Sequence, residues 1–136
     1  MKQLSAVLIG LFAILLISSC TKSPAENIIG EWKITDIKTT SEIPEDQIEV
    51  YKEAMEDWKA SFKMVYNADG TYEKTISEET TKGTWEISED GKTLTEKSDD
   101  GLEESIGISE LTDKKFVSVS VIDDETTNTM TFEKVK

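Results

Sequence analysis

Cys20 is the residue of this chain whose chemistry its surroundings identify best. It follows an N-terminal segment that carries one positive charge, at Lys2, and is almost wholly apolar over residues 4–17. The small residues Ser18 and Ser19 then precede the cysteine, as a processing peptidase requires. The apolar stretch is too short to be a membrane span, because it would cover about 21 Å as a helix and a hydrocarbon core is about 30 Å thick. Residues 1–19 are therefore predicted to be a secretory signal peptide.

The residues beside the cleavage position indicate the fate of the cysteine. The segment Ile17-Ser18-Ser19-Cys20 resembles a bacterial lipobox, in which the cysteine is acylated and becomes the new N-terminus. A lone buried thiol is the alternative, but the polar neighbours of Cys20 are not typical of a core. Cys20 is accordingly the expected lipidation site, and the membrane its partner. Thr21 and Lys22 carry no acidic retention signal, which favours an outer-membrane lipoprotein of the cell envelope, facing either the periplasm or the exterior.

The rest of the composition excludes several kinds of site. The 136 residues include 28 acidic residues, 15 basic residues that are all Lys, one Cys and no His, for a formal net charge of −13. Without His or a second thiol, Ser-His-Asp triads, Cys-His pairs and the usual zinc sites are excluded. Because such an acidic surface repels phosphate backbones, no nucleic-acid partner is expected. No catalytic residue, metal or cofactor is predicted.

Acidic runs at residues 99–104 and 123–125 are the remaining candidates for chemistry. Carboxylate oxygens bind calcium, and a pair of carboxylates can hydrolyse a glycosidic bond. However, no twelve-residue loop with alternating ligands is present, and no spacing singles out two carboxylates. Because the runs fall at predicted turns, we interpret them as solvated charge.

Short strands are the main elements that would position side chains. Apolar residues alternate at period two, and Thr, Val and Ile are abundant, as strands prefer. Asp-Gly pairs at 69–70, 90–91 and 100–101 predict tight hairpin turns. Eight strands are predicted, at residues 31–38, 61–67, 71–77, 81–88, 92–98, 102–109, 115–122 and 126–135. This spacing predicts an all-β fold, an eight-stranded antiparallel up-and-down barrel, with a two-sheet sandwich as the alternative.

One segment, residues 44–61, has helical rather than strand spacing. Its apolar residues fall three or four positions apart, and charged residues occupy the opposite face. Pro44 suits the first helical position, and the acidic residues after it suit the positive end of the helix dipole. An amphipathic helix is therefore predicted between the first two strands. With a polar tether at residues 20–26, the chain is predicted to hold one domain, residues 27–136.

Four short motifs carry a family resemblance. They are Ile28-Ile29-Gly30-Glu31-Trp32, Asn67-Ala68-Asp69-Gly70-Thr71-Tyr72, Gly83-Thr84-Trp85-Glu86-Ile87 and Thr129-Met130-Thr131-Phe132-Glu133-Lys134. In this order they resemble the lipocalin superfamily, and in particular the small lipocalin-like lipoproteins of Bacteroidota. The resemblance implies that Gly30 and Trp32 lie at the closed floor of the barrel. The family often packs an Arg over this Trp, a place that in this chain falls to Lys134 or Lys136 or stays empty.

A barrel of this kind predicts a binding protein rather than an enzyme. An eight-stranded barrel has room for its own side chains or for one small ligand. The candidate cavity residues are Met64, Tyr72, Trp85, Val119 and Phe132, and the candidate lid residues, on the helix, are Tyr51, Met55 and Trp58. We expect a monomer that binds a small apolar or amphipathic ligand. The alternative is a protein-interaction module or inhibitor that uses the exterior and loops of a filled barrel.

Overall fold

The structure, a computed structural model, describes residues 21–135, so the predicted signal peptide, Cys20 and Lys136 lie outside the described residues. Strands make up most of this part of the chain. In chain order the elements are α1 (Pro24–Ile28), β1 (Gly30–Thr39), the 3-10 helix η1 (Glu45–Gln47), α2 (Ile48–Ser61), β2 (Phe62–Tyr66), β3 (Thr71–Ile76), β4 (Glu79–Ile87), β5 (Thr93–Ser98), β6 (Glu103–Leu111), β7 (Lys115–Val121) and β8 (Thr127–Lys134). The strand bounds agree with the predicted ones to within two residues.

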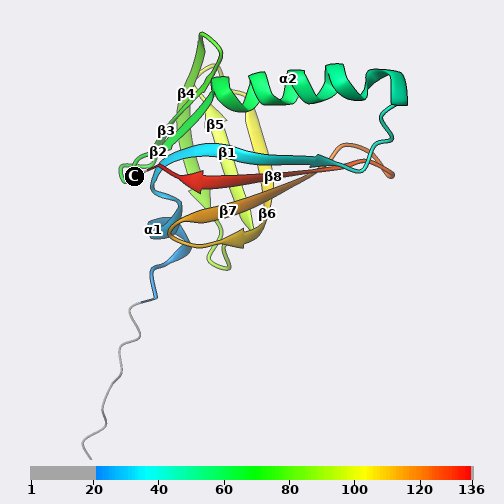
Figure 1. Cartoon of the computed structure of the whole chain (residues 1–136). Helices are drawn as coiled ribbons and strands as arrows, with labels where there is room; N and C mark the ends of the chain where they lie inside the picture. Colours follow the sequence, from blue (N-terminus) through cyan, green and yellow to red (C-terminus); the bar gives the residue numbers. More distant parts are fainter. Residues whose placement is uncertain (1–20, 136) are drawn as a thin grey trace, which may run out of the picture.

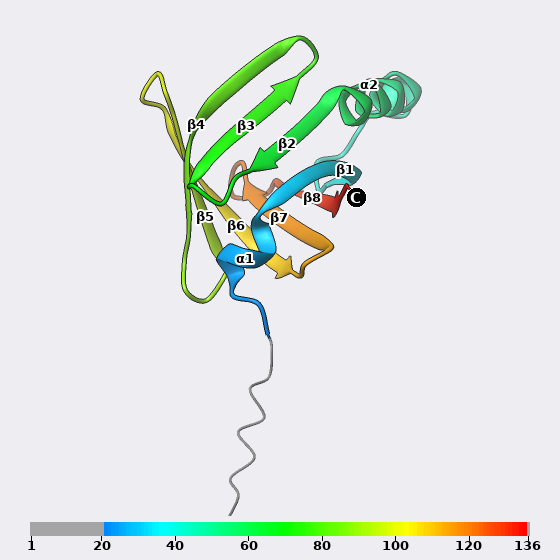
Figure 2. The ribbon, with the colours of Figure 1, turned by 90° about the vertical axis from the view of Figure 1, so that its left-hand side faces the viewer.

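The eight strands form one closed barrel (Figures 1 and 2). Each strand pairs antiparallel with the next, and β1 closes the barrel by pairing with β8, where Ile34 lies opposite Phe132. The predicted up-and-down barrel is therefore confirmed. The sandwich alternative is wrong, because all eight strands belong to a single hydrogen-bonded sheet.

Three hairpins turn at the Asp-Gly pairs that predicted them. Gly70, Gly91 and Gly101 have φ angles of +86°, +70° and +93°, a region that residues with a Cβ rarely adopt. In the first of these turns the Thr71 hydroxyl and backbone N–H donate to Asp69 Oδ1 at 2.6 and 3.0 Å. These hydrogen bonds favour the ionised carboxyl and lower the pKa of Asp69. The turn sequences thus fix the strand ends both through hydrogen bonds to a side chain and through the backbone conformation of glycine.

The closed end of the barrel is built around Trp32. Its side chain is fully buried, and its ring meets that of Phe116 edge-on at 4.8 Å between centres. Trp32 Nε1 donates to the carbonyl oxygen of Ile28 at 2.7 Å. The cation beside this ring is Lys134, whose Nζ lies 4.8 Å from the ring centre. Gly30 makes room for it, because a Cβ at Gly30 would lie 3.0 Å from Cε of Lys134.

A short helix, α1, covers this closed end, where a tether was expected up to residue 26. The Ser23 hydroxyl accepts a hydrogen bond from Glu26 N, and the Glu26 carboxylate accepts one from Ser23 N at 2.7 Å. Pro24 stands in the first turn, where its missing N–H costs nothing. This reciprocal capping orders the segment, and α1 packs against β4 and β6. Residues 24–26 of the predicted tether thus form the start of α1.

The predicted amphipathic helix lies between β1 and β2. Its first turn is the 3-10 helix η1, which follows Pro44, and α2 continues to Ser61. Figure 1 shows α2 running out beyond the barrel, above the projecting ends of β1 and β8. No residue of α2 is fully buried, so the helix rests on the strands by one face only. Among residues 21–135, no helix has both the length and the apolar character needed to cross a membrane.

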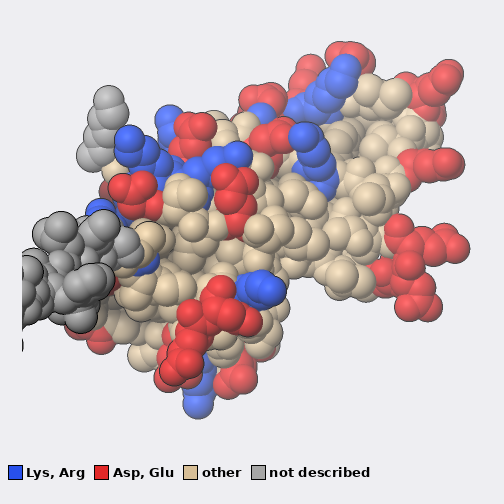
Figure 3. Space-filling model, turned by 90° about the horizontal axis from the view of Figure 1, so that it is seen from below, with Lys and Arg blue, Asp and Glu red and all other residues tan. Residues whose placement is uncertain are grey.

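The outer face of β7 and β8 carries uncharged β-branched residues. Three cross-strand pairs join them: Val117 with Thr131, Val119 with Thr129, and Val121 with Thr127. We call this surface the Val–Thr face. Figure 3 shows charged side chains around a broad uncharged area over these projecting strands. This uncharged area contrasts with the formal net charge of −13 that the chain carries as a whole.

Candidate functional site

The barrel interior holds a cavity of about 240 Å³. Its apolar wall comes mainly from β2, β7 and β8 and includes Phe62, Met64, Phe116, Met130 and Phe132. The rings of Phe116 and Phe132 stack with their centres 4.1 Å apart, which gives this wall a flat aromatic surface. The polar lining residues are Tyr66, Lys74, Glu104, Ser118 and Ser120. A mostly apolar cavity with a few polar groups is the usual form of a small-molecule site.

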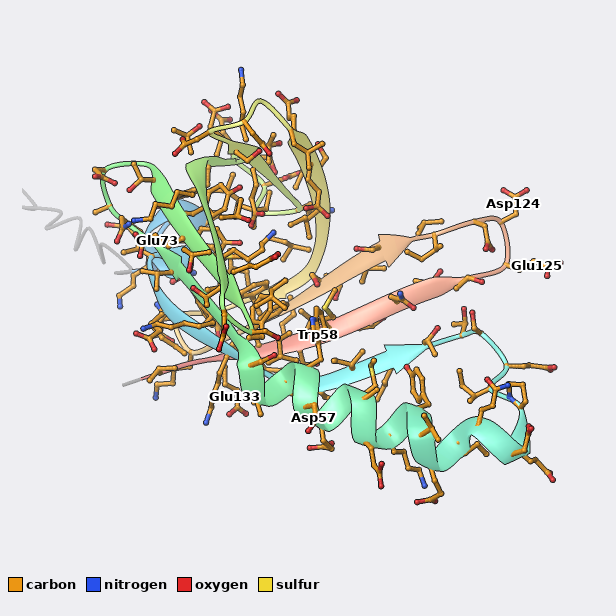
Figure 4. All side chains as sticks on the ribbon, turned by 90° about the horizontal axis from the view of Figure 1, so that it is seen from above. Asp57, Trp58, Glu73, Asp124, Glu125 and Glu133 are labelled. Carbon is orange, nitrogen blue, oxygen red and sulfur yellow. The ribbon has the colours of Figure 1, made fainter. Side chains whose placement is uncertain are left out.

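A groove of about 570 Å³ lies between α2 and the projecting strands. The helix contributes Tyr51, Met55 and Trp58, and the strand side includes Ile37, Thr39, Asn128 and Met130. Figure 4 shows Trp58 directed from α2 toward the strands, whereas its neighbour Asp57 points away from them. Trp58 and Met130 line both the groove and the inner cavity, so this pair forms the boundary between the two.

An ionic cluster that runs from the buried Glu96 to Glu104, whose side chain is 59% exposed, forms the polar side of the cavity. Glu96, on β5, is 1% exposed and lies directly opposite Glu104 on β6. Lys74, on β3, bridges the two carboxylates, with Nζ 2.6 Å from Glu96 and 3.7 Å from Glu104. The Tyr66 hydroxyl donates a short hydrogen bond to the other oxygen of Glu96. The lysine therefore relieves the repulsion between two like charges on neighbouring strands.

Tyr66 remains a hydrogen-bond donor in this cluster. Burial of its hydroxyl, and the negative charge of Glu96 beside it, raise the pKa of Tyr66 well above its usual value near 10. The phenol is consequently neutral at every physiological pH. Glu96 then receives one hydrogen bond from a neutral donor and one from the Lys74 ammonium, and its buried charge is compensated on both oxygens.

Of the five candidate cavity residues, the structure brings Met64 and Phe132 into the cavity lining. Tyr72 and Trp85 are buried but lie outside that lining, because they pack beside Tyr66 nearer the closed end. Trp85 Nε1 also donates to the carbonyl oxygen of Asn67 at 3.0 Å, which ties the ring to the β2–β3 turn. These two rings support the cavity without lining it.

Val119 lies on the opposite side of the strand from the cavity, and the prediction that it lines the cavity is wrong. Phe116 faces inward and pairs with Phe132, so the alternation of β7 directs Ser118 and Ser120 inward as well. Val119 then falls on the Val–Thr face. The alternating valines of this strand thus mark its outer face, and serines occupy the inner one.

The three candidate lid residues all line the groove, and Trp58 also lines the inner cavity. The ionic cluster, by contrast, was not singled out by sequence reasoning. One signal for it exists: Glu96 stands between Leu94 and Ser98 at strand spacing, and all three are buried. A buried leucine two residues away places Glu96 on the inner face. Within residues 21–135, no group of three Cys, His, Asp or Glu side chains is arranged to hold a metal ion.

Comparison with known proteins places this barrel in a family. Residues 28–118 match the family model described as a lipocalin-like domain. The chain belongs to the lipocalin-like domain family. Lipocalin-like domains are generally non-catalytic binding proteins.

This lipocalin-like domain also resembles a solved structure. The crystal structure of a DUF4847 family protein from Bacteroides vulgatus superposes with a TM-score of 0.57 and 16% sequence identity, over 80% of this chain and 94% of that protein. At this level of identity the likeness concerns the fold. No curated protein matches this chain.

Proposed function

We propose that this lipocalin-like domain binds a small apolar or amphipathic molecule in the barrel cavity and the adjoining groove, while lipidated Cys20 anchors it to the outer membrane. The observation that carries the proposal is the shared boundary of the two spaces at Trp58 and Met130. The cavity alone, at about 240 Å³, is smaller than most small-molecule sites, which span roughly 300–1,000 Å³. Together with the groove, the site falls within that range.

The start of the described chain and the groove lie toward opposite ends of the barrel. The described chain enters beside α1 at the closed end, whereas α2 lies toward the other end (Figure 2). An acyl group on Cys20 would therefore hold the closed end toward the membrane and leave the groove facing the aqueous side. We propose that the ligand exchanges with the aqueous phase of the envelope rather than directly with the bilayer.

Filling the cavity from one strand position tests ligand binding. The protein is the chain from residue 20 onward with Cys20→Ser, and the probe is the neutral fluorophore N-phenyl-1-naphthylamine. We expect saturable binding that Ser118→Leu weakens by at least about fivefold, because the larger side chain occupies the cavity. Val119→Leu is the matched control and should change the affinity less than about twofold, since it adds volume on the Val–Thr face.

The folded state of both variants is checked by circular dichroism, and Ser120→Leu, at a more exposed lining position, replaces Ser118→Leu if the latter does not fold. Absence of saturable probe binding to the parent protein would sink the proposal. Equal weakening by Ser118→Leu and Val119→Leu would also contradict it, because the cavity would then not be where the probe binds.

A protein-interaction module is the second candidate function, and the Val–Thr face favours it. Val121, at the end of this face, is 74% exposed. A monomer rarely leaves a contiguous apolar surface open without a use for it. In the same binding experiment, a parent protein that takes up no probe would favour this second candidate over ligand binding.

A further inference from the structure

Lys74 is the one cation among the residues that line the cavity and the groove. Its ammonium is already committed to two carboxylates, at 2.6 Å to Glu96 and 3.7 Å to Glu104. The cluster of Lys74, Glu96 and Glu104 therefore carries one net negative charge, and Tyr66 adds a neutral phenol. A cavity that must receive a carboxylate is instead expected to present an uncompensated cation.

An anionic ligand would have to displace one of these carboxylates. Competition for Lys74 would leave Glu96 buried with its charge only partly compensated, which is strongly unfavourable. The formal net charge of −13 adds a repulsive field around the whole chain. A head group that donates hydrogen bonds meets neither obstacle, because it can approach Glu104 without disturbing the Lys74–Glu96 pair.

The groove presents a second acceptor in need of a donor. Asn128 lines the groove beneath α2, and its side-chain oxygen Oδ1 is buried without a hydrogen-bond partner. An unsatisfied buried acceptor is costly, so the missing donor has to come from water or from an occupant of the groove. Asn128 on β8 and Glu104 on β6 are independent features, and a ligand group that donates hydrogen bonds suits both.

We infer that the site selects amphiphiles whose polar end donates hydrogen bonds, either neutral or cationic, over amphiphiles with a carboxylate. This inference rests on the proposed ligand-binding function and names its ligand class. The apolar part of the ligand lies against the aromatic wall of the cavity and beneath Trp58. The polar end pairs with Glu104 or Asn128, according to its distance from the apolar part.

Displacement of N-phenyl-1-naphthylamine by three ligands of equal chain length tests the inference. Decylamine, decanol and decanoate are compared at pH 7, below their micelle concentrations, with the Cys20→Ser chain from residue 20 onward. We expect decylamine to bind at least about tenfold more tightly than decanoate, with decanol in between. Glu104→Gln should reduce the ratio of decylamine to decanoate affinity by at least about threefold, because it removes the accessible acceptor charge.

Glu103→Gln is the matched control. It removes the same charge from the adjacent, outward-facing position of β6, and it should change the ratio less than about twofold. Decanoate that competes as well as decylamine would overturn the inference while probe binding upheld the proposed function. Equal effects of Glu104→Gln and Glu103→Gln would overturn it too, since the preference would then reflect only the overall charge. Failure of the parent protein to bind the probe would instead refute the proposed function itself.

Discussion

Lys134 Nζ lies over the ring of Trp32 at 4.8 Å and also donates to the carbonyl oxygens of Asn27 and Ile29, at 2.9 and 2.8 Å. One ammonium thus joins the last strand, the first strand and the end of α1. Lys134→Met should lower the free energy of unfolding by about 1–2 kcal/mol, because the cation–π contact and both hydrogen bonds are lost. Urea unfolding followed by tryptophan fluorescence measures the change.

Lys33→Met is the control for this prediction. Lys33 is exposed and follows Trp32 directly on the other face of β1. Its replacement should alter the free energy of unfolding by less than about 0.5 kcal/mol. If Lys134→Met and Lys33→Met had the same free energy of unfolding, the contact between Lys134 and Trp32 would contribute nothing to stability.

Removal of the Lys74 ammonium should lower the free energy of unfolding more than removal of the Lys134 ammonium. Lys74→Met leaves Glu96 buried without its cation, and we expect a loss of about 3–5 kcal/mol in the free energy of unfolding. The double variant Lys74→Met/Glu96→Gln should recover about 2 kcal/mol of this, because the amide carries no charge and still accepts from Tyr66. Lys82→Met is the matched control: Lys82 contacts Glu73 at the same 2.6 Å but at the surface, where a pair contributes about 0–1 kcal/mol. Equal losses at Lys74 and Lys82 would contradict the buried-cluster interpretation.

The raised pKa of Tyr66 predicts a loss of stability in alkaline solution. Its pKa is raised in the folded protein, so between about pH 10 and the folded-state pKa the native state holds a proton that the unfolded state has released. The free energy of unfolding should therefore fall as the pH rises above about 10. Tyr66→Phe should flatten this slope, with part retained because the pKa of Tyr72 is also raised by burial. Tyr51→Phe, in the groove, is the control, and identical slopes for both variants would refute the assignment.

Asn128 offers a test of the unsatisfied acceptor through the stability of the ligand-free protein. Asn128→Val should raise the free energy of unfolding of the ligand-free protein by about 1 kcal/mol, since it removes an unsatisfied buried acceptor and valine favours strands. Thr129→Val, on the outer face, should change it by less than about 0.5 kcal/mol. A loss of stability in Asn128→Val would mean that the amide oxygen has a partner in solution.

Cys20→Ala tests the anchor, which lies outside the described residues. Without the thiol no acyl group can be attached, and several acyl chains together are needed for stable anchoring. We expect the variant to move from the membrane fraction to the soluble fraction of the host cell, as measured by fractionation and immunoblotting. Ser19→Ala keeps a small residue before the cysteine and should stay in the membrane fraction. Unchanged membrane association of Cys20→Ala would refute the lipidation prediction.

The fold was predictable because the turn residues and the spacing of apolar residues indicate the same elements. The Asp-Gly pairs at 69–70, 90–91 and 100–101 locate three hairpins, since glycine is needed where φ is positive. The spacing of apolar residues over 48–58 is helical, and no competing strand pattern exists there. The capping box at Ser23 and Glu26 is also visible in the sequence, but a polar segment beside a predicted anchor is equally typical of a tether.

The cavity lining was less predictable than the fold. Which alternate residues of a strand face inward depends on pairing between residues that are distant in the sequence. In β7 the valines alternate as regularly as the serines, and only the pairing of Phe116 with Phe132 decides which set faces inward. Glu96 carries a charge that ordinarily belongs on a surface, and its burial depends on Lys74 two strands away. Neither relation follows from neighbouring residues alone.

Closure of the barrel through β1 and β8 requires the first and last strands of the domain to meet during folding. Trp32 pairs with Lys134, and Thr39 pairs with Asn128, so the two ends of the domain must meet. Contacts between such distant residues form late, after the entropy of closing the long loop has been overcome. A chain made from its N-terminus cannot complete the cavity before its last strand is released. A product truncated before β8 would present two unpaired strand edges and be a target for aggregation or proteolysis.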